Sequence, residues 1–311
     1  MKIDPIESAL AALDDVPLHT SEGHKQIAKA LSGKSNLVAA KAARVVGDAL
    51  WPELTPDLAA AFDRFIARAA AGDKGCAASI AIARALFNLD HDDADVYLKG
   101  MCHVQMEPVW GGSVDTAAEL RAICAMGLAN TRYPGRLRAL ADLLVDREWQ
   151  ARAGAVRALA VAGSEAALLL LRFKALSGDR EPEVIADCFT GLLSAEGAEA
   201  VPFVASFADA KDKEVKDAAI LALGASRRAD AVEWMIERFQ AVADMETRKC
   251  ILLSLAASRT EAAVGFVLQL IREGSAQISD FAVSAMEINR GDGQIQARID
   301  EALSDRSSRI K

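Results

Sequence analysis

Apolar residues recur along this chain with the spacing of helices that bury one face. Positions i, i+3, i+4 and i+7 are apolar in four segments, which predicts four amphipathic helices of the same kind. The four sets are Leu137, Leu140, Ala141 and Leu144; Ala200, Phe203, Val204 and Phe207; Val232, Met235, Ile236 and Phe239; and Val264, Val267, Leu268 and Ile271. The same helix therefore recurs along the chain.

A second element recurs between these segments and is marked by a small residue at one helical position. Its members are Ala125, Ala158, Gly191, Ala222, Ser254 and Ala285, separated by 33, 33, 31, 32 and 31 residues. A small side chain at a fixed position suits a close helix crossing, because a larger one would push the neighbouring helix away. The pattern predicts helix pairs that repeat and stack, so that the core runs along one axis.

An Asp-x-Glu turn separates the two helices of each pair. It occurs at Asp146–Glu148, Asp179–Glu181, Asp212–Glu214 and Asp244–Glu246. An Asp placed just before a helix is a natural N-cap, since its carboxylate accepts from the first free N–H groups. We therefore expect each of these residues to cap the second helix of its pair.

Three repeats combine a turn Asp, a basic residue early in the second helix and a small residue six positions later. This combination resembles the HEAT-repeat family, in its short bacterial form of the phycobilisome-lyase type. The basic residue stands in Ala151-Arg152, Val215-Lys216 and Thr247-Arg248. The resemblance covers residues 20 to 305. It implies an all-α chain, an α-solenoid that forms a right-handed superhelix of about eight HEAT-like helix pairs with terminal capping helices.

The N-terminal third follows this pattern with longer spacing. Second helices are expected at Leu37–Leu50 and Cys76–Leu89, a first helix at Leu54–Ala71, and caps at Asp4–Leu13 and Gln294–Leu303. No Gly/Ser/Pro-rich linker divides the chain, which predicts a single domain over residues 1–311. Its parts are degenerate repeats at 1–116, regular repeats at 117–290 and a C-terminal cap at 291–311.

The composition agrees with this class and restricts the function. Hydrophobic residues make up 52% of the 311 residues but aromatic ones only 5%, so most apolar side chains are small or aliphatic and suit closely packed helices. The net charge of −8 disfavours a nucleic-acid binder that acts through a generally basic surface.

Cysteine usage and hydropathy indicate the compartment. The five cysteines are odd in number and contain no CxxC pair, so they do not indicate a disulfide framework. Four of them, Cys76, Cys124, Cys188 and Cys250, are expected in second helices as buried small hydrophobes. The first residues lack the long apolar region of a secretory signal, and no uncharged apolar run approaches the length of a membrane span. We expect a protein of the reducing cytoplasm with no membrane partner.

Basic residues provide the first candidate site. If the second helices line a concave face, Arg152, Lys216 and Arg248 form a ladder for an acidic peptide or a phosphate; alternatively, each pairs with a turn Asp. Between Arg121 and Arg180, a span that includes Arg157, ten basic residues stand against five acids, a balance of +5 that leaves −13 elsewhere. Such a segment favours docking of an acidic stretch of a partner.

Residues Asn88–Thr116 are the least repeat-like part of the chain. Acids surround His91, and His103 follows twelve residues later, but this spacing is not that of a metal site, so the acids are expected to cap and solubilise the next helix. Trp110 stands before two glycines and is either an anchor for a partner or a side chain that folds back over a helix pair.

Three enzyme classes resemble this architecture. Deoxyhypusine hydroxylase uses repeated His-Glu pairs, and this sequence has no His-Glu dipeptide. Phycobilin lyases share the repeat, but no residue pattern here marks a tetrapyrrole site. The DNA-alkylation-repair glycosylases, with a basic groove, aromatic residues and a carboxylate, remain an alternative because Trp149 and Asp146 lie in the basic segment.

The sequence thus predicts a non-enzymatic scaffold that binds a protein or an acidic peptide, without catalytic residues, metal or cofactor. The expected partner-binding residues are Arg121, Arg152, Arg157, Lys216, Arg248 and Trp110. The alternative is a nucleic-acid-binding protein related to the glycosylases. The oligomeric state stays open.

Overall fold

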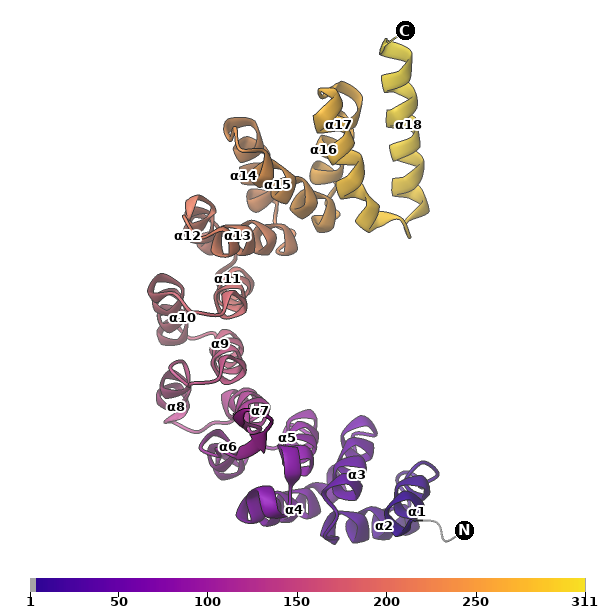
Figure 1. Ribbon diagram of the computed structural model, residues 1–311, viewed down its shortest axis with the longest axis vertical. Helices are drawn as coiled ribbons and strands as arrows, with labels where there is room; N and C mark the ends of the chain where they lie inside the picture. The colour runs from indigo at the N-terminus through magenta and orange to yellow at the C-terminus, as the bar shows by residue number, and fades with distance from the viewer. Residues whose placement is uncertain (1–3, 311) are drawn as a thin grey trace. The chain divides into compact units, whose positions relative to one another are not determined.

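The computed structural model describes residues 4–310, and most of this part of the chain is helical (Figure 1). The helices and strands are α1 Pro5–Ala12, α2 Ser21–Ser32, α3 Asn36–Asp48, α4 Thr55–Arg68, α5 Ala77–Asn88, α6 Ala94–Met101, β1 Met106–Val109, β2 Gly112–Asp115, α7 Ala118–Asn130, α8 Arg136–Leu143, α9 Trp149–Ala162, α10 Glu165–Ser177, α11 Pro182–Glu196, α12 Val201–Ala205, α13 Lys213–Ala225, α14 Ala229–Ala241, α15 Met245–Ser258, α16 Glu261–Glu273, α17 Ala276–Met286 and α18 Gly293–Ile310.

The chain divides into two compact units, Met1–Leu170 and Leu171–Lys311, with the boundary inside α10. In the first unit the second helices α3, α5, α7 and α9 pack on one another in that order, and α2, α4 and α6 form the other layer. In the second unit α11, α13, α15 and α17 stack in the same way. The predicted all-α, helical-repeat class is confirmed.

The expected terminal helices are present as well. Helix α1 packs on α3, and its N-cap is Asp4, whose carboxylate accepts from the N–H of Ile6 at 2.9 Å. At the other end α18 packs on α16, and it continues to Ile310 instead of ending at Leu303. Arg306 of α18 donates to the backbone oxygens of Ile271 and Gly274, so it satisfies carbonyls left free at the end of α16.

The stacking of second helices depends on small side chains. All six recurring small residues, Ala125, Ala158, Gly191, Ala222, Ser254 and Ala285, are buried. Glycines show how close the helices come. A Cβ built on Gly154 of α9 would lie 2.4 Å from Cα of Ala122 in α7, and one on Gly224 of α13 would lie 2.6 Å from the backbone oxygen of Ser254 in α15. Neighbouring second helices thus touch main chain to main chain.

The turn aspartates cap the second helices in only half of the predicted cases. Asp212 and Asp244 are N-caps, and they accept from Glu214 N at 2.9 Å and from Thr247 N at 3.0 Å. Asp146 and Asp179 lie two residues before their helices' N-caps and accept from the N–H two residues ahead, at 2.8 and 2.9 Å. There the carboxylate fixes the turn, and its other oxygen remains available for a basic side chain.

Two further observations complete the fold. Among residues 4–310, none of the helices combines the length and the unbroken apolar character needed to cross a bilayer. In the connection that joins α6 to α7, β1 and β2 form a hairpin that the sequence analysis did not predict.

Glycine substitutions test the close approach of the second helices. We expect Gly154→Ala to lower the free energy of unfolding by roughly 1–3 kcal/mol, because the methyl group would overpack the α7–α9 contact. Gly265→Ala in α16, where an added Cβ meets nothing within 4 Å, should raise it by about 0.5–1 kcal/mol through helix propensity. Urea denaturation followed by circular dichroism measures both, and equal effects would contradict this packing.

Candidate interaction site

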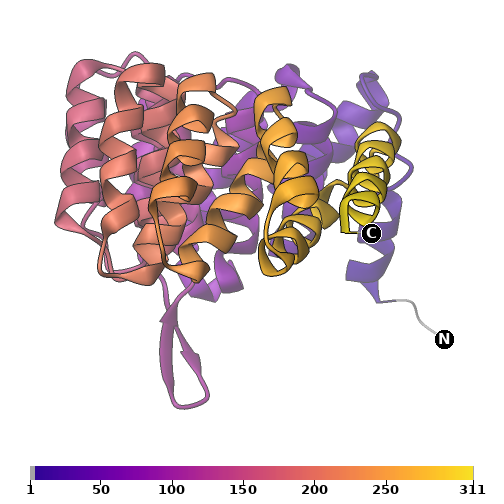
Figure 2. The same ribbon diagram turned by 90° about the horizontal axis from the view of Figure 1, so that it is seen from above.

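The hairpin between α6 and α7 is the most distinctive surface feature of the first unit. Its strands pair antiparallel, with Met106 opposite Asp115 and Val109 opposite Gly112, so Trp110 and Gly111 form the turn. Gly111 has a φ of +89°, a value that favours glycine. Figure 2 shows the hairpin extending away from the helices that carry it.

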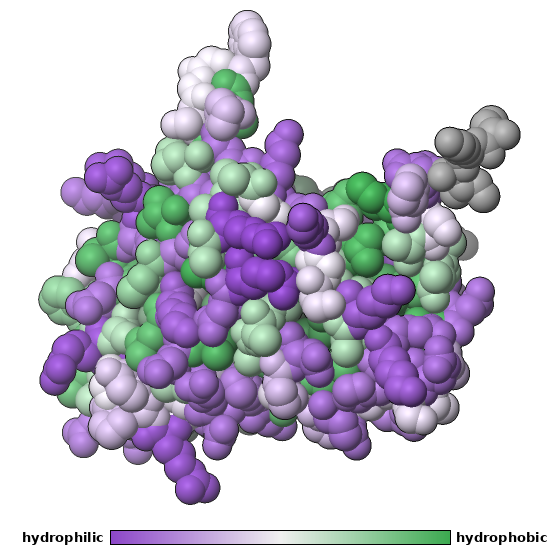
Figure 3. Space-filling view, turned by 90° about the horizontal axis from the view of Figure 1, so that it is seen from below, coloured by the Kyte–Doolittle hydropathy of each residue, from purple (hydrophilic) through white to green (hydrophobic). Residues whose placement is uncertain are grey.

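The tip of the hairpin is apolar and fully accessible. Trp110 has a relative exposure of 103%, so its side chain packs against no other described residue. Met106, Val109 and Val114 are also exposed, and the outer part of the projection in Figure 3 has pale and green colours in place of deep purple. The alternative that Trp110 folds back over a helix pair is wrong. The indole stays exposed because the turn places it beyond the last strand pair.

The base of the hairpin is fixed by a buried carboxylate. Oε1 of Glu107 accepts from the N–H of Gly75 at 2.5 Å, from Nε2 of Gln105 at 2.7 Å and from Oγ1 of Thr116 at 2.9 Å. These hydrogen bonds, led by the one from Gly75, lower the pKa of Glu107 below its ordinary 4.5. Since Gly75 precedes α5, the carboxylate ties the hairpin to the preceding helix pair.

Arg121 of α7 fixes the other strand. Its side chain is 2% exposed and forms a bidentate pair with Asp146, with Nε and Nη2 each 2.9 Å from a carboxylate oxygen. Nη1 donates to Oδ2 of Asp115 at 2.8 Å and to the backbone oxygen of His103 at 2.9 Å. Burial acts to raise the pKa of Asp115, but hydrogen bonds from Ala117 N, Gln105 N and Arg121 outweigh it and lower that pKa.

A third buried acid extends this network into the helix layer. The Asp73 carboxylate accepts from the N–H groups of Ala78 and Ser79, each at 2.8 Å, and its backbone oxygen accepts from Nε2 of Gln105 at 2.8 Å. The stem of the hairpin is therefore bonded to Gly75, just before α5, and to Arg121 of α7. Arg121 in turn binds Asp146 in the turn before α9. A rigid stem presents a freely accessible indole.

The basic ladder predicted from the sequence binds its own chain. Arg152 is 9% exposed and its Nη1 donates to the backbone oxygens of Asp146 and Arg147 at 2.9 and 3.0 Å. Nζ of Lys216 donates to Oγ1 of Thr247 at 3.0 Å and lies 3.8 Å from Asp244. Lys216 therefore contacts the turn Asp of the next repeat, as the structural alternative predicts, whereas these bonds of Arg152 go to the backbone of its own turn.

The remaining predicted cations differ in their surroundings. Nε of Arg248 donates to the backbone oxygen of Val242 at 2.7 Å, and its guanidinium lies over the ring of Phe239. Arg157 is exposed on α9, whereas Arg121 is buried in the ion-pair network. The six predicted residues therefore do not form one surface, and Asp146, the carboxylate of the glycosylase alternative, is bound to Arg121.

The second unit presents acidic groups next to this ladder. A shallow groove of about 360 Å³ between α11 and α13 is lined by Glu183, Glu214 and Asp217 around Ala218 and Leu221. Nζ of Lys213 lies 2.5 Å from Asp217. A basic strip for an acidic partner does not extend over this groove.

Possible metal ligands do not gather among the described residues, and three of the cysteines are buried. Among them, no group of three His, Cys, Asp or Glu side chains is arranged to hold a metal ion. Asp93 caps α6 and accepts from Asp95 N at 3.0 Å, as expected for the acids of this segment. Burial raises the pKa of Cys76 to about 11 and that of Cys188 to about 12, which disfavours the reactive thiolate.

Comparisons with known proteins add little to this picture. No protein-family model matches the chain, and no curated protein matches it significantly. Among solved structures, the CpcE–CpcF complex of phycocyanin lyase from a Nostoc species is 13% identical with a TM-score of 0.36, covering 94% of this chain and 96% of that one. Human deoxyhypusine hydroxylase is 16% identical with a TM-score of 0.31, covering 82% and 91%.

An engineered protein is 18% identical, with a TM-score of 0.37 and coverage of 96% of this chain and 91% of that one. At these identities and TM-scores the likenesses carry no argument about family or activity. The functional argument therefore rests on the site itself.

Replacing Arg121 tests the anchoring network. We expect Arg121→Ala to lower the free energy of unfolding by about 3–5 kcal/mol, because it leaves Asp115 and Asp146 without their buried counter-charge. Arg138→Ala, at an exposed position of α8, should change it by less than about 0.5 kcal/mol. Chemical denaturation provides the measurement, and a small effect at Arg121 would show that the network is not what holds the hairpin.

Acid should loosen the base of the hairpin. The pKa of Glu107 is lowered in the folded chain. Its contribution to the stability of the hairpin base is therefore fully present above the ordinary pKa of 4.5 and is lost as the pH falls through the lowered pKa. Hydrogen exchange at the amide of Gly75, corrected for intrinsic rates, should accelerate over this range. Glu107→Gln should remove that pH dependence, and an unchanged profile in the variant would reject this role of the carboxylate.

Proposed function

We infer that this protein is a non-enzymatic interaction scaffold whose docking element is the β-hairpin at residues 106–115. The observation that supports it is the full exposure of Trp110 on a stem that is bonded to Gly75 before α5 and to Arg121 of α7. Trp is the residue type most enriched at binding hot spots, and a rigid presentation reduces the entropy lost on binding.

The chemistry of the hairpin indicates the type of partner. Its tip bears apolar and small side chains, so the contact is made by burying apolar surface and not by ion pairing. The predicted cations Arg152, Lys216 and Arg248 contact groups of their own chain. These contacts give no support to nucleic-acid binding. A protein partner with a concave apolar surface fits the tip best.

Site-specific photocrosslinking tests this function. A benzophenone amino acid introduced at position 110 should crosslink to a protein in cells that express the full chain, and the adduct is identified by mass spectrometry. The matched control carries the same group at Gln240, an exposed position of α14. Adducts of equal yield and identity at both positions, or none at position 110, would contradict a docking role for the hairpin.

A further inference from the structure

Helix α10 exposes apolar side chains where the surface of a helix is normally polar. Leu169, Phe173 and Leu176 lie four and three positions apart, so they share one face of the helix. Their relative exposures are 59%, 67% and 69%. The buried face of α10 is a different one, which includes Ala167 and Leu171. The three exposed side chains therefore add nothing to the core of the repeat.

The corresponding helices of other repeats are polar at these positions. In α14, two repeats further along, the three matching residues are Glu233, Glu237 and Gln240. In α8 the exposed residues are both charged and are Arg138 and Asp142. Since these helices stack without an apolar outer face, the repeat does not require one on α10. An exposed apolar stripe of this kind marks an interaction surface.

The stripe is free of exposed charge along its length. After Glu165, every exposed residue of α10 is uncharged. The two cations within the helix are held by carboxylates of the same chain. Nη2 of Arg172 lies 2.5 Å from Oε2 of Glu196, and Nζ of Lys174 lies 2.7 Å from Oδ2 of Asp179. Neither cation therefore adds an unpaired charge beside the stripe.

The two ends of the stripe carry opposite charges. Glu165 begins α10 and Arg180 follows its last turn; both are exposed, and within residues 4–310 neither forms an ion pair. The pair Glu165 and Arg180 and the pair Leu169 and Leu176 are both centred beside Phe173. A two-fold axis at this centre places each leucine of one copy on the other leucine of a second copy. It also places each charge of one copy near the opposite charge of the second.

We propose that this protein forms a two-fold symmetric dimer in which α10 packs antiparallel on α10 of a second copy. The contact is isologous, because both copies use the same surface. The inference is independent of the hairpin and goes beyond the proposed function. The 13 residues of α10 span about 20 Å, so the contact is smaller than the ~800 Å² per partner of a standard complex. The dimer therefore dissociates on dilution.

Other occupants match this face less well. An anionic membrane surface or a nucleic acid requires lysines or arginines beside the apolar residues, and Arg172 and Lys174 are paired with acids of this chain. A different protein would bury the apolar stripe equally well. The opposite charges at equal distances from Phe173, however, are complementary to the same surface in a second copy.

Sedimentation velocity over a series of concentrations tests the apolar stripe. The sedimentation coefficient of the full chain should rise toward that of a dimer, and Phe173→Glu should raise the dissociation constant by about 30-fold or more. Leu169→Glu should act in the same direction. Both variants give α10 the residue that α14 carries at the matching position, so the cooperative melting curve by circular dichroism should persist. A wild-type chain that stays monomeric, or folded variants that dimerise like the wild type, overturn the proposal.

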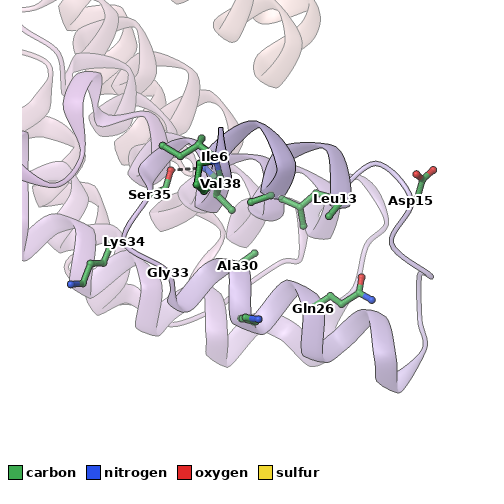
Figure 4. A pocket seen from close by; sticks show the side chains of 13 residues that line it. Ile6, Leu13, Asp15, Gln26, Ala30, Gly33, Lys34, Ser35 and Val38 are labelled. Atoms are coloured by element: carbon green, nitrogen blue, oxygen red, sulfur yellow. Dashed lines mark hydrogen bonds between the residues drawn. The ribbon is translucent and has the colours of Figure 1, made fainter. Parts of the chain in front are cut away.

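An apolar surface elsewhere in the chain supplies the control. A groove of about 630 Å³ lies between α1 and α2, and Figure 4 shows Ile6 among the side chains that line it. Ile6 is 40% exposed, so Ile6→Glu replaces an accessible apolar side chain without touching α10. This variant should dimerise like the wild type. Loss of the dimer in Ile6→Glu together with its retention in Phe173→Glu overturns the proposal.

Exchange of charges tests the antiparallel arrangement. Glu165→Arg and Arg180→Glu should each weaken the dimer by about 5-fold, because each places like charges together at both ends of the contact. The two substitutions in one chain should restore it. An equimolar mixture of the two single variants should form a heterodimer with the affinity of the wild type, since opposite charges then meet again. Unchanged single variants, or a double variant and a mixture that both stay weak, overturn the proposal.

One further variant separates this inference from the proposed function. Trp110→Ala should leave the dimer intact, and loss of the dimer there instead would assign self-association to the hairpin and reject the α10 contact. A monomeric chain that still crosslinks from position 110 to another protein rejects the dimer and leaves the scaffold function in place. A dimer that depends on Phe173, without a crosslink from position 110, supports this inference and rejects the docking role of the hairpin.

Discussion

The close approach of neighbouring second helices is the constraint on which this structure depends. Where Gly154 meets Ala122, and where Gly224 meets Ser254, no room exists for an additional methyl group. A second helix must therefore place a small residue wherever it meets its neighbour in this way, while the first helices and the turns can vary in length. The regular stack in each unit is a consequence of this one requirement. Variation is confined to the connections.

The connection between α6 and α7 shows what that freedom permits. At the regular turns a single aspartate such as Asp212 suffices, since it has to satisfy only the first amides of one helix. The hairpin needs more, because its base brings Glu107, Asp115 and Arg121 out of water. Burying these charges is costly unless each is paired and fully hydrogen-bonded. Arg121 is paired with Asp115 and Asp146, and Oε1 of Glu107 accepts three hydrogen bonds, so the stem is held while the tip remains accessible.

Much of the fold was predictable from the sequence because it follows local, periodic signals. The recurring small residues from Ala125 to Ala285 are all buried, and the expected helix at Leu37–Leu50 is close to the observed α3. The hairpin escaped notice because strands of four residues are too short for periodicity to identify, even with glycines beside Trp110. Its anchoring was hidden for another reason. Asp73, Gln105 and Arg121 come from distant segments, and only the fold brings them together.

At the candidate site, too, local features were predictable from the sequence and contacts between distant residues were not. Trp110 was recognised from its neighbours in sequence, and the placement of Arg152 and Lys216 in the first turns of second helices was correct. What their side chains bind depends on the path of the preceding turn, which the pattern of residues does not specify.

Pro108 in β1 has a consequence for the addition of further strands at the edge of the hairpin. A two-stranded hairpin leaves both outer edges open, and open edges invite further strands to add and form growing sheets. Proline has no N–H and so removes one of the few donors that β1 offers in its four residues. Main-chain templating is thereby weakened. Recognition is left to the side chains at the turn, so the hairpin can bind a partner without pairing its backbone with further strands.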